Sequence, residues 1–274
     1  MTQELLVDRL LQQVLTSPKY RSVCEDAIRY IGRTELAKRG TLKAAVKATK
    51  DKLHQIGGAY FRSTPKYAAW LDKLRTAKQE ENQEKFRRLC IQFMSVHSST
   101  FERLEELNRF YVSLFSRLPP IHSILDVACG LNPLAIPWMP ISGSTDYYAY
   151  DIYIDLIEFI GNFVKLTGVR SHAQAVDVLH NPPTVRADLA FVLKNVPCFD
   201  QIDKAAAAQL VDRLDARYIL VSFPRQSLGG TGEFLTRQYT ARFAELVKDR
   251  HWAVSRMEYK TELVFLIDKT ETRP

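Results

Sequence analysis

The sequence has few of the residues that build a disulfide framework or a metal site. Its four cysteines form no C-x-x-C pair, and its six histidines are scattered and show no H-E-x-x-H pattern. This spacing argues against a zinc motif, so we expect no bound metal and reduced thiols. The cysteines are Cys24, Cys90, Cys129 and Cys198.

The chain also lacks any apolar run long enough to cross a bilayer. Its first residues, MTQELLVDRLLQQV, carry acids within an apolar pattern of helical spacing, which predicts an amphipathic helix rather than a signal peptide. We therefore expect a cytoplasmic protein with no membrane partner. With 274 residues, of which 46% are hydrophobic, the chain can bury the core of one large or two modest domains.

Glycine-rich phosphate-binding motifs are missing as well. The sequence has 11 glycines but contains neither G-x-G-x-x-G nor G-x-x-x-x-G-K-[ST]. Residues 123–140, SILDVACGLNPLAIPWMP, nevertheless read as an apolar strand followed by a turn with one glycine, Gly130. An α/β fold presents backbone N–H groups to a nucleotide-like ligand with such a turn. A single glycine indicates a ligand without a pyrophosphate, such as S-adenosylmethionine.

Acidic residues are scarce in the first third of the chain. Residues 1–95 contain 19 Lys and Arg against 10 Asp and Glu, a balance of +9, whereas residues 96–274 contain 19 against 21. The apolar periodicity of this region is helical, with helices predicted at 1–17, 19–38, 41–55, 66–76, 80–95 and 99–117. The basic surface favours a polyanion partner, although any one of its lysines could belong to an ordinary solvated helix face.

After Pro119 and Pro120 the pattern changes to short β-rich runs that alternate with helical ones. Strands are predicted at 123–128, 147–150, 171–175, 189–193 and 218–222, with helices at 133–138, 152–167 and 202–214. Two extended runs at 251–259 and 262–268 then predict a terminal antiparallel hairpin. Five parallel strands and this hairpin are the layout of a Rossmann-like S-adenosylmethionine-dependent methyltransferase. We expect a helical docking domain at 1–95 and a methyltransferase domain at 96–274.

Suitable ligand groups follow three of the predicted strands, at the edge where open α/β sheets bind ligands. Gly130 follows the first strand, Asp151 and Ile152 the second, and Asp177 and Val178 the third. The Asp151 carboxylate can accept hydrogen bonds from ribose hydroxyls, and Asp177 can accept the adenine amino group while Val178 packs on the ring. Each of these groups alone could instead belong to an ordinary turn or cap the N-terminus of a helix. Together they predict the cofactor site.

Several motifs together resemble the aminoglycoside-resistance 16S ribosomal RNA methyltransferases. They are MSVHSSTFERL (94–104), DVACGLNPLAIPWM (126–139), VLKNVPC (192–198) and VSFPRQSLGG (221–230), with SPKYRSV (17–23) and KLHQIGGAY (52–60) in the helical extension. The resemblance implies methylation of guanine N7 in the decoding site of 16S rRNA within the assembled small subunit, by a monomeric enzyme. It also implies resistance to 4,6-disubstituted aminoglycosides.

The resemblance also implies roles for individual residues. Arg103 would hold the methionine carboxylate of S-adenosylmethionine in a pocket lined by Ala128 and Gly130. Lys194 and Asp200 would lie beside the target guanine as the catalytic pair. The predicted RNA-binding residues are Lys19, Lys43, Lys47, Lys50, Arg225 and Arg237.

One segment departs from the family pattern. A basic, glycine-containing run that ends in Met is expected after SFPRQSLGG, but Thr231–Leu235 reads TGEFL. Because that run is expected to touch the target nucleotide, two alternatives stay open: a methyltransferase of the same fold acting on another RNA site, and a non-catalytic RNA-binding relative. A methyltransferase acting on a small molecule is disfavoured, because such a substrate would not need the basic surface of the first third of the chain.

Overall fold

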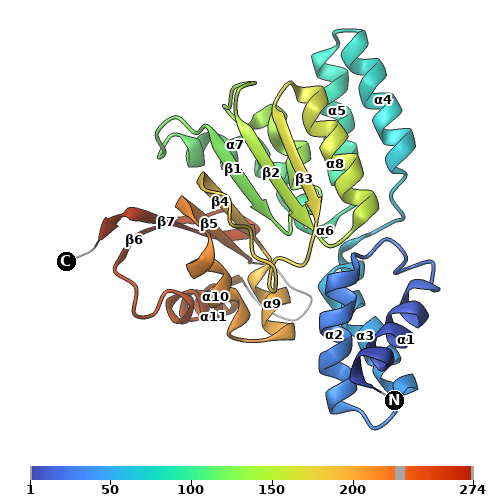
Figure 1. Ribbon diagram of the computed structural model, residues 1–274. Helices are drawn as coiled ribbons and strands as arrows, with labels where there is room; N and C mark the ends of the chain where they lie inside the picture. The colour runs from blue at the N-terminus through green and yellow to red at the C-terminus, as the bar shows by residue number, and fades with distance from the viewer. Residues whose placement is uncertain (1, 226–231, 273–274) are drawn as a thin grey trace.

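The computed structural model describes residues 2–225 and 232–272, which fold around a seven-stranded sheet of order β3-β2-β1-β4-β5-β7-β6 (Figure 1). Strands β1 to β5 are mutually parallel, and β7 pairs antiparallel with both β5 and β6. The predicted five parallel strands and terminal hairpin are thereby confirmed. The strands are β1 Ser123–Val127, β2 Asp146–Asp151, β3 Arg170–Ala175, β4 Ala187–Leu193, β5 Ala216–Pro224, β6 Trp252–Glu258 and β7 Glu262–Thr272.

The sheet separates two apolar cores because successive side chains of a strand point to opposite faces. In β1, Ile124 joins the core beneath α8 (Ile154–Thr167), whereas Leu125 and Val127 join the core beneath α10 (Ala206–Arg213) and α11 (Gly232–Leu246). Every one of these three strand residues is fully buried. This packing holds the carboxyl ends of the parallel strands in a fixed row.

The N-terminal helices form two groups with different neighbours. Helices α1 (Gln3–Leu15), α2 (Glu25–Lys38) and α3 (Leu42–Ile56) pack on one another beside the end of the sheet, whereas α4 (Tyr67–Gln79) and α5 (Gln83–Met94) lie along α8 (Figure 1). Thr2 and Thr41 cap α1 and α3 by accepting backbone N–H groups. The predicted boundary between two domains at residue 95 falls after α5. It stays a prediction, because buried residues of both helix groups belong to one continuous core.

Several helices begin or end elsewhere than predicted. The run at 99–117 is three short pieces, α6 Ser98–Phe101, η2 Leu104–Glu106 and α7 Leu107–Phe115. The second helix starts at Glu25 rather than at residue 19, because residues 22–24 bond to the loop after β2 instead. The helix predicted at 202–214 corresponds to the shorter α10, whereas α9 Val196–Ile202, with Pro197 in its first turn, was not predicted. Helix α11 was not predicted.

Two short 3-10 segments complete the secondary structure: η1 (Gly58–Tyr60) after α3 and η3 (Asn132–Trp138) after β1. The second is the predicted helical stretch at 133–138, tightened to a 3-10 form that contains Pro137. Within the two described ranges, no helix combines the length and the apolarity that a membrane span requires.

Candidate active site

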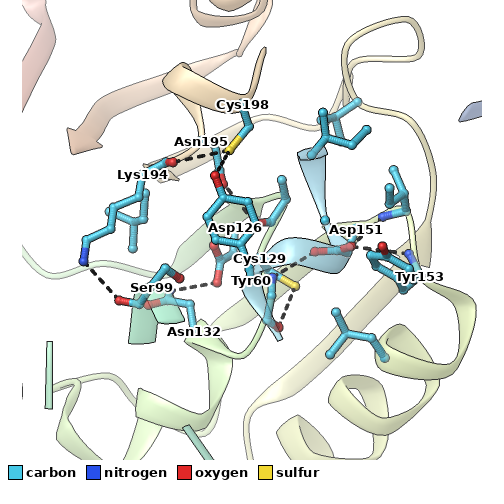
Figure 2. Close-up of a pocket in the computed structure, with 18 of the residues that line it drawn as sticks. Tyr60, Ser99, Asp126, Cys129, Asn132, Asp151, Tyr153, Lys194, Asn195 and Cys198 are labelled. Atoms are coloured by element: carbon cyan, nitrogen blue, oxygen red, sulfur yellow. Dashed lines mark hydrogen bonds between the residues drawn. The ribbon is translucent and has the colours of Figure 1, made fainter. Parts of the chain in front are cut away.

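A cavity of about 950 Å³, measured with its open mouth, lies at the carboxyl ends of β1 to β4 (Figure 2). The structure brings all seven predicted cofactor-binding residues to its wall, together with Lys194. The seven are Arg103, Ala128, Gly130, Asp151, Ile152, Asp177 and Val178.

The turn after β1 approaches the cavity with an unusual backbone. Ala128 has φ 49° and Gly130 has φ 50°, in the left-handed region that costs a residue with a side chain on the order of 1–3 kcal/mol. A Cβ atom on Gly130 would lie 3.3 Å from Cε1 of His97. The backbone angle and the closeness of the imidazole both favour glycine at this position.

Asp151, at the end of β2, ties the first two strand-end loops together. Its Oδ2 accepts the Gly130 N–H at 2.9 Å, and its Oδ1 accepts the N–H groups of Ile152 at 2.7 Å and Tyr153 at 3.3 Å. Burial raises its pKa, and the three N–H donors oppose this rise only in part. A carboxylate has about four lone-pair sites, so about one is left for a ribose hydroxyl.

Asp177, after β3, also has backbone and side-chain partners of its own. Its Oδ1 accepts the N–H of Leu179 at 3.1 Å, and its Oδ2 lies 2.5 Å from Nδ1 of His180. These bonds close the loop into a tight turn and place the neighbouring Val178 in the wall, where it is almost fully buried. Asp177 thus shapes the loop in addition to any bond that it makes to a ligand.

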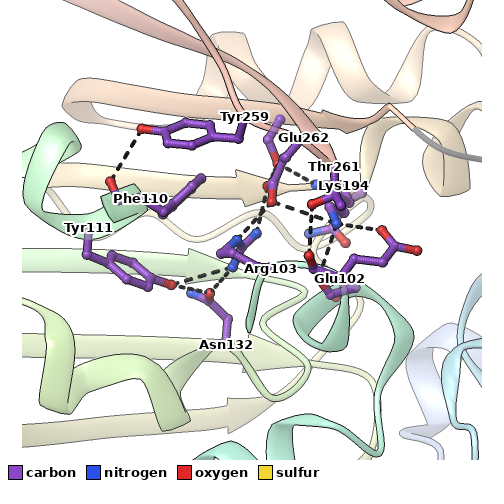
Figure 3. A network of polar contacts seen from close by, with 12 residues as sticks. Glu102, Arg103, Phe110, Tyr111, Asn132, Lys194, Tyr259, Thr261 and Glu262 are labelled. Atoms are coloured by element: carbon purple, nitrogen blue, oxygen red, sulfur yellow. Dashed lines mark hydrogen bonds and ion pairs between the residues drawn. The ribbon is translucent and has the colours of Figure 1, made fainter. Parts of the chain in front are cut away.

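Arg103 is held in place by a buried polar network (Figure 3). Its Nε and Nη2 donate to the Glu262 carboxylate at 2.9 and 2.7 Å, and its Nη1 donates to Oδ1 of Asn132 at 2.7 Å. Both charged residues are at most 3% exposed. The guanidinium has five N–H donors, so at least one remains for the cavity that Arg103 lines.

The network continues from Asn132 into the sheet. Asn132 Nδ2 donates to Oδ2 of Asp126 at 2.9 Å, and the hydroxyl of Tyr147 donates to the same oxygen at 2.6 Å. Burial raises the pKa of Asp126 to about 7, although both of these donors lower it. Near neutral pH the network therefore contains a carboxyl that is close to half protonated.

Lys194 follows β4 and faces the same network. It has φ 59°, and its Nζ lies 2.7 Å from Oε2 of Glu102 and 3.7 Å from Oε2 of Glu262. Its Nζ also donates to the backbone oxygen of Ser99 at 3.2 Å. The ammonium is thus neutralised inside the protein while the residue still lines the cavity.

Asp200, the other half of the predicted catalytic pair, lies on α9. Arg242 of α11 grips both its oxygens, with Nη2–Oδ1 at 2.5 Å and Nε–Oδ2 at 2.7 Å. Its side chain is 23% exposed, and it is not among the residues that line the cavity. The structure therefore brings Lys194 to the cavity wall and uses Asp200 to join α9 to α11.

The predicted RNA-binding residues are spread over two regions. Lys43, Lys47 and Lys50 occupy successive turns of α3, the first two exposed and the third half-buried, and Lys19 Nζ lies 2.9 Å from Nδ1 of His54 on the same helix. The last residue of α3, Ile56, lines the cavity, so the lysine stripe leads toward the cavity along the helix.

The second region lies around β5 and α11. Arg225 donates to the backbone oxygen of Tyr259 at 2.8 Å and to Oγ1 of Thr236 at 3.1 Å, so it anchors the end of β5. Arg237 is exposed on α11. Of the divergent stretch Thr231–Leu235, Thr231 lies outside the described residues. The remainder begins α11, where Phe234 is 59% exposed.

Sequence reasoning missed the contribution of the helical region to the cavity. Gly57, Tyr60 and Phe61 form part of its wall, and the Tyr60 hydroxyl lies 2.8 Å from Sγ of Cys198 on α9. The available signal was the glycine pair in KLHQIGGAY: a Cβ on Gly57 would lie 2.6 Å from the Tyr153 hydroxyl.

His97 was also missed, although its motif had been noticed. It lines the cavity beside Gly130, and burial, together with the nearby charge of Lys194, lowers its pKa to about 4. The imidazole is therefore neutral at physiological pH. In the part of the chain that the structure describes, no group of three or more His, Cys, Asp or Glu side chains could hold a metal ion.

Comparison with known proteins gives one consistent result. The family described as "Ribosomal RNA methyltransferase (FmrO)" matches residues 16–266. A 16S rRNA (guanine(1405)-N(7))-methyltransferase of Micromonospora rosea is 35% identical over 265 residues, which are 96% of this chain and 97% of the relative. The enzyme of the same name from Serratia marcescens is 32% identical over 263 residues, 96% of this chain and 98% of the relative.

Solved structures of similar proteins share the whole fold. The 16S rRNA methyltransferase RmtF, in complex with S-adenosyl-L-homocysteine, superposes with a TM-score of 0.79 at 28% identity and covers 96% of this chain and 97% of its own. The 16S rRNA methylase RmtB superposes with a TM-score of 0.77 at 30% identity and covers 96% of this chain and 98% of its own.

Proposed function

The chain belongs to the FmrO family of ribosomal RNA methyltransferases, and we propose that it transfers a methyl group from S-adenosylmethionine to N7 of a guanine in 16S rRNA. The observation that carries the proposal is the cavity: the loops after β1, β2 and β3 bring Gly130, Asp151 and Asp177 to its wall, and the buried Arg103, between α6 and η2, lies beside them. The substrate comes from the relatives, whose names give guanine 1405 of 16S rRNA as the target.

The donor set of the cavity fits S-adenosylmethionine. The remaining N–H donors of Arg103 suit the carboxylate of its methionine part, and Asp151 and Asp177 suit the ribose and the adenine amino group. Gly130 leaves the room that a Cβ would fill. When bound, the cofactor supplies a methyl group on a positively charged sulfur, and a neutral His97 at the wall avoids repelling that charge.

The target atom explains why the site needs no dedicated general base. Guanine N7 has an in-plane lone pair and carries no proton, so it can attack a methyl group directly. The task of the protein is then to hold the base in line with the methyl group and to exclude water. The target base must also leave its stack, at a cost of a few kcal/mol. Lys194, at the wall and neutralised by Glu102, is placed to orient the base without adding charge.

Phe223 and Phe234 are two candidates for stacking on an extruded base. Phe223 is fully buried and stacks on Tyr239, so it packs the core. Phe234 suits stacking better, because it is exposed at the start of α11, within the divergent stretch Thr231–Leu235. Base–aromatic stacking contributes about 1–3 kcal/mol.

The docking surface supports the assembled small subunit as the substrate. A balance of +9 in residues 1–95 suits a large folded RNA, and the lysine stripe of α3 leads to the cavity. The enzyme would act as a monomer in the cytoplasm, where the ribosomal subunits are. Methylation at the decoding site would block 4,6-disubstituted aminoglycosides, whose binding site includes that guanine.

A methylation assay on two substrates tests the proposal. The purified protein is given S-adenosylmethionine with a labelled methyl group, and incorporation is measured on intact small subunits and on naked 16S rRNA. We expect label on the subunits and little on the naked RNA. Equal labelling of both would refute the docking role of residues 1–95, and label on neither would refute the proposed function.

The TGEFL stretch favours a second candidate, the same reaction on another RNA site. Thr231 and Glu233 stand where basic residues are expected, and Glu233 lies in the first turn of α11. Restoring positive charge with Glu233→Lys separates the two readings. If this stretch governs target choice, the variant changes the position that is methylated; if it only contacts the phosphate backbone, the variant changes the affinity alone.

A further inference from the structure

A short segment before α2 is hydrogen-bonded to the loop that follows β2. The Cys24 N–H donates to the backbone oxygen of Ile152 at 2.8 Å, and the Ile154 N–H donates to the backbone oxygen of Ser22 at 2.6 Å. Val23 and Tyr153 form an antiparallel bridge between the two segments. The helical region is thus joined by backbone hydrogen bonds to a loop that lines the cavity.

The first turn of α2 makes a second connection, to the loop after β3. Oδ2 of Asp26 accepts the backbone N–H of Asp177 at 2.9 Å and the side-chain amide of Asn181 at 3.1 Å. Burial raises the pKa of the Asp26 carboxyl, but hydrogen bonds from the Cys24 thiol, Asp177 and Asn181 outweigh it, and the pKa lies below its ordinary value. Asp26 is therefore an ionised acceptor at neutral pH, and its two bonds to the loop are charge-assisted.

One turn further along α2, Tyr30 supports the same loop from the side. Its ring stacks on the ring of His180, and His180 in turn pairs with the Asp177 carboxylate. The loop after β3 is joined to β2 by the Val176 N–H, which donates to the backbone oxygen of Asp151 at 2.8 Å, and it is also held by α2 at two points. Residues 176–179 of this loop line the cavity where Asp177 and Val178 face the proposed adenine position.

We propose that Asp26 is a positioning residue for cofactor binding, which holds the loop after β3 in the conformation that receives the adenine. The inference rests on the proposed function, because it takes S-adenosylmethionine as the ligand. Its physical basis is preorganisation: a loop that is already ordered loses less conformational entropy when the ligand binds. The helical domain then completes the cofactor site as well as docking RNA.

The test compares two neighbouring acids of α2. Asp26→Ala removes the acceptor for Asp177 and Asn181, whereas Glu25→Ala removes an exposed acid whose partner, Arg29, is on the same helix at 3.8 Å. Both substitutions remove one negative charge from the same helix N-terminus, so they match in their effect on the helix dipole. Calorimetry with S-adenosylhomocysteine gives the affinity of each variant, and thermal unfolding shows whether each is folded.

We expect Asp26→Ala to weaken S-adenosylhomocysteine binding about tenfold and Glu25→Ala to leave it unchanged. The KM for S-adenosylmethionine should rise about as much, while the single-turnover rate at saturating cofactor stays the same. Asp26→Asn, which keeps one acceptor oxygen, should restore most of the affinity. A folded Asp26→Ala variant with wild-type affinity would overturn the inference.

Asn181→Ala provides a second route if Asp26→Ala does not fold. It removes one of the two bonds from the loop side and leaves α2 intact, so we expect about a threefold loss of affinity. No loss with this variant would contradict the inference in the same way. The wild-type protein separates this result from the proposed function: if the wild type does not bind S-adenosylhomocysteine, the proposed function fails, whatever the variants do.

Discussion

The two ends of the cavity are built differently. At the cofactor end, Asp151 and Asp177 accept backbone N–H groups that close the loops after β1, β2 and β3, and the buried Arg103–Glu262 pair and Asp26 of α2 add contacts from distant parts of the chain. At the target end, near β4, β5 and α9, the geometry rests on ion pairs between residues far apart in the chain. Lys194 pairs with Glu102, and Asp200 pairs with Arg242.

This difference teaches which parts of the site tolerate change. A strand-end loop closed by its own backbone depends on a few short motifs, such as D-V-A-C-G in β1 and its turn. An end built from ion pairs can exchange its partners and thereby its target. The family departure at TGEFL lies at that second end, close to α11, which supplies Arg242.

The largest expected effect is that of replacing Arg103, the cation proposed to bind the methionine carboxylate of S-adenosylmethionine. Arg103→Met should abolish measurable S-adenosylmethionine binding and leave Glu262 buried without its partner, a loss of about 3–5 kcal/mol in the free energy of unfolding. Adding Glu262→Gln should recover part of the stability but none of the binding. Recovery of binding in the double variant would show that Arg103 is only a structural residue. Calorimetry and denaturant unfolding measure the two quantities.

The next effect concerns the proposed RNA-docking surface, the lysine stripe of α3. Replacing Lys47 and Lys50 with Glu should weaken binding to small subunits about 10–100-fold and flatten the salt dependence by about 2 in the log–log slope, because phosphate contacts release counterions. S-adenosylmethionine binding should not change. Lys248→Glu, on an exposed residue just after α11, is the charge reversal that matches Lys47→Glu alone. An equal loss with Lys248→Glu would mean that net charge alone, and not the stripe on α3, governs docking.

A smaller effect tests whether Asp200 acts through its ion pair. Asp200→Asn should slow single-turnover methylation about tenfold with subunit docking largely kept, because α9 would be less firmly joined to α11. Arg242→Met should slow it equally, since both substitutions break the same bidentate contact. If Arg242→Met is fully active while Asp200→Asn is not, Asp200 acts at the target base itself. The target end would then depend on this residue directly and not on its ion pair.

A separate expected effect is a pH dependence of stability at the base of the cofactor end. Burial raises the pKa of Asp126 to about 7, so the folded protein binds a proton that the unfolded chain releases near pH 4. The free energy of unfolding should therefore fall as pH rises through this window, and level off above pH 7. Asp126→Asn keeps an acceptor for Asn132 and Tyr147 and should remove this part of the slope. An unchanged slope would place its origin elsewhere.

Sequence reasoning predicted which strand-end residues line the cavity because the information for them is local. Each strand end is followed within a few residues by the group that lines the cavity, and parallel strands bring those ends to one edge. Glu262 could not be found in this way, because it meets Arg103 across 159 residues of chain. The same holds for Asp200 and Arg242, which are 42 residues apart and lie on two helices, α9 and α11, that were not predicted.

The helical wall was missed for a different reason. Tyr60 and His97 reach the cavity only because α3 and α6 pack beside the strand ends, and helical periodicity predicts a buried face without saying what it packs against. Two glycines before Tyr60 were the one local sign of a close approach. The division at residue 95 therefore separates the basic part of the chain from the rest, but residues from both sides of it line the cavity.

The most direct test of the account is to map the modified nucleotide. Small subunits are incubated with the protein and S-adenosylmethionine, and N7-methylguanine is located along the 16S rRNA by chemical cleavage at the modified base and primer extension. The account predicts a single new stop at the guanine that the relatives' names number 1405, and none when Arg103→Met replaces the wild type. A stop at another nucleotide, or a modification other than N7-methylguanine, would contradict it.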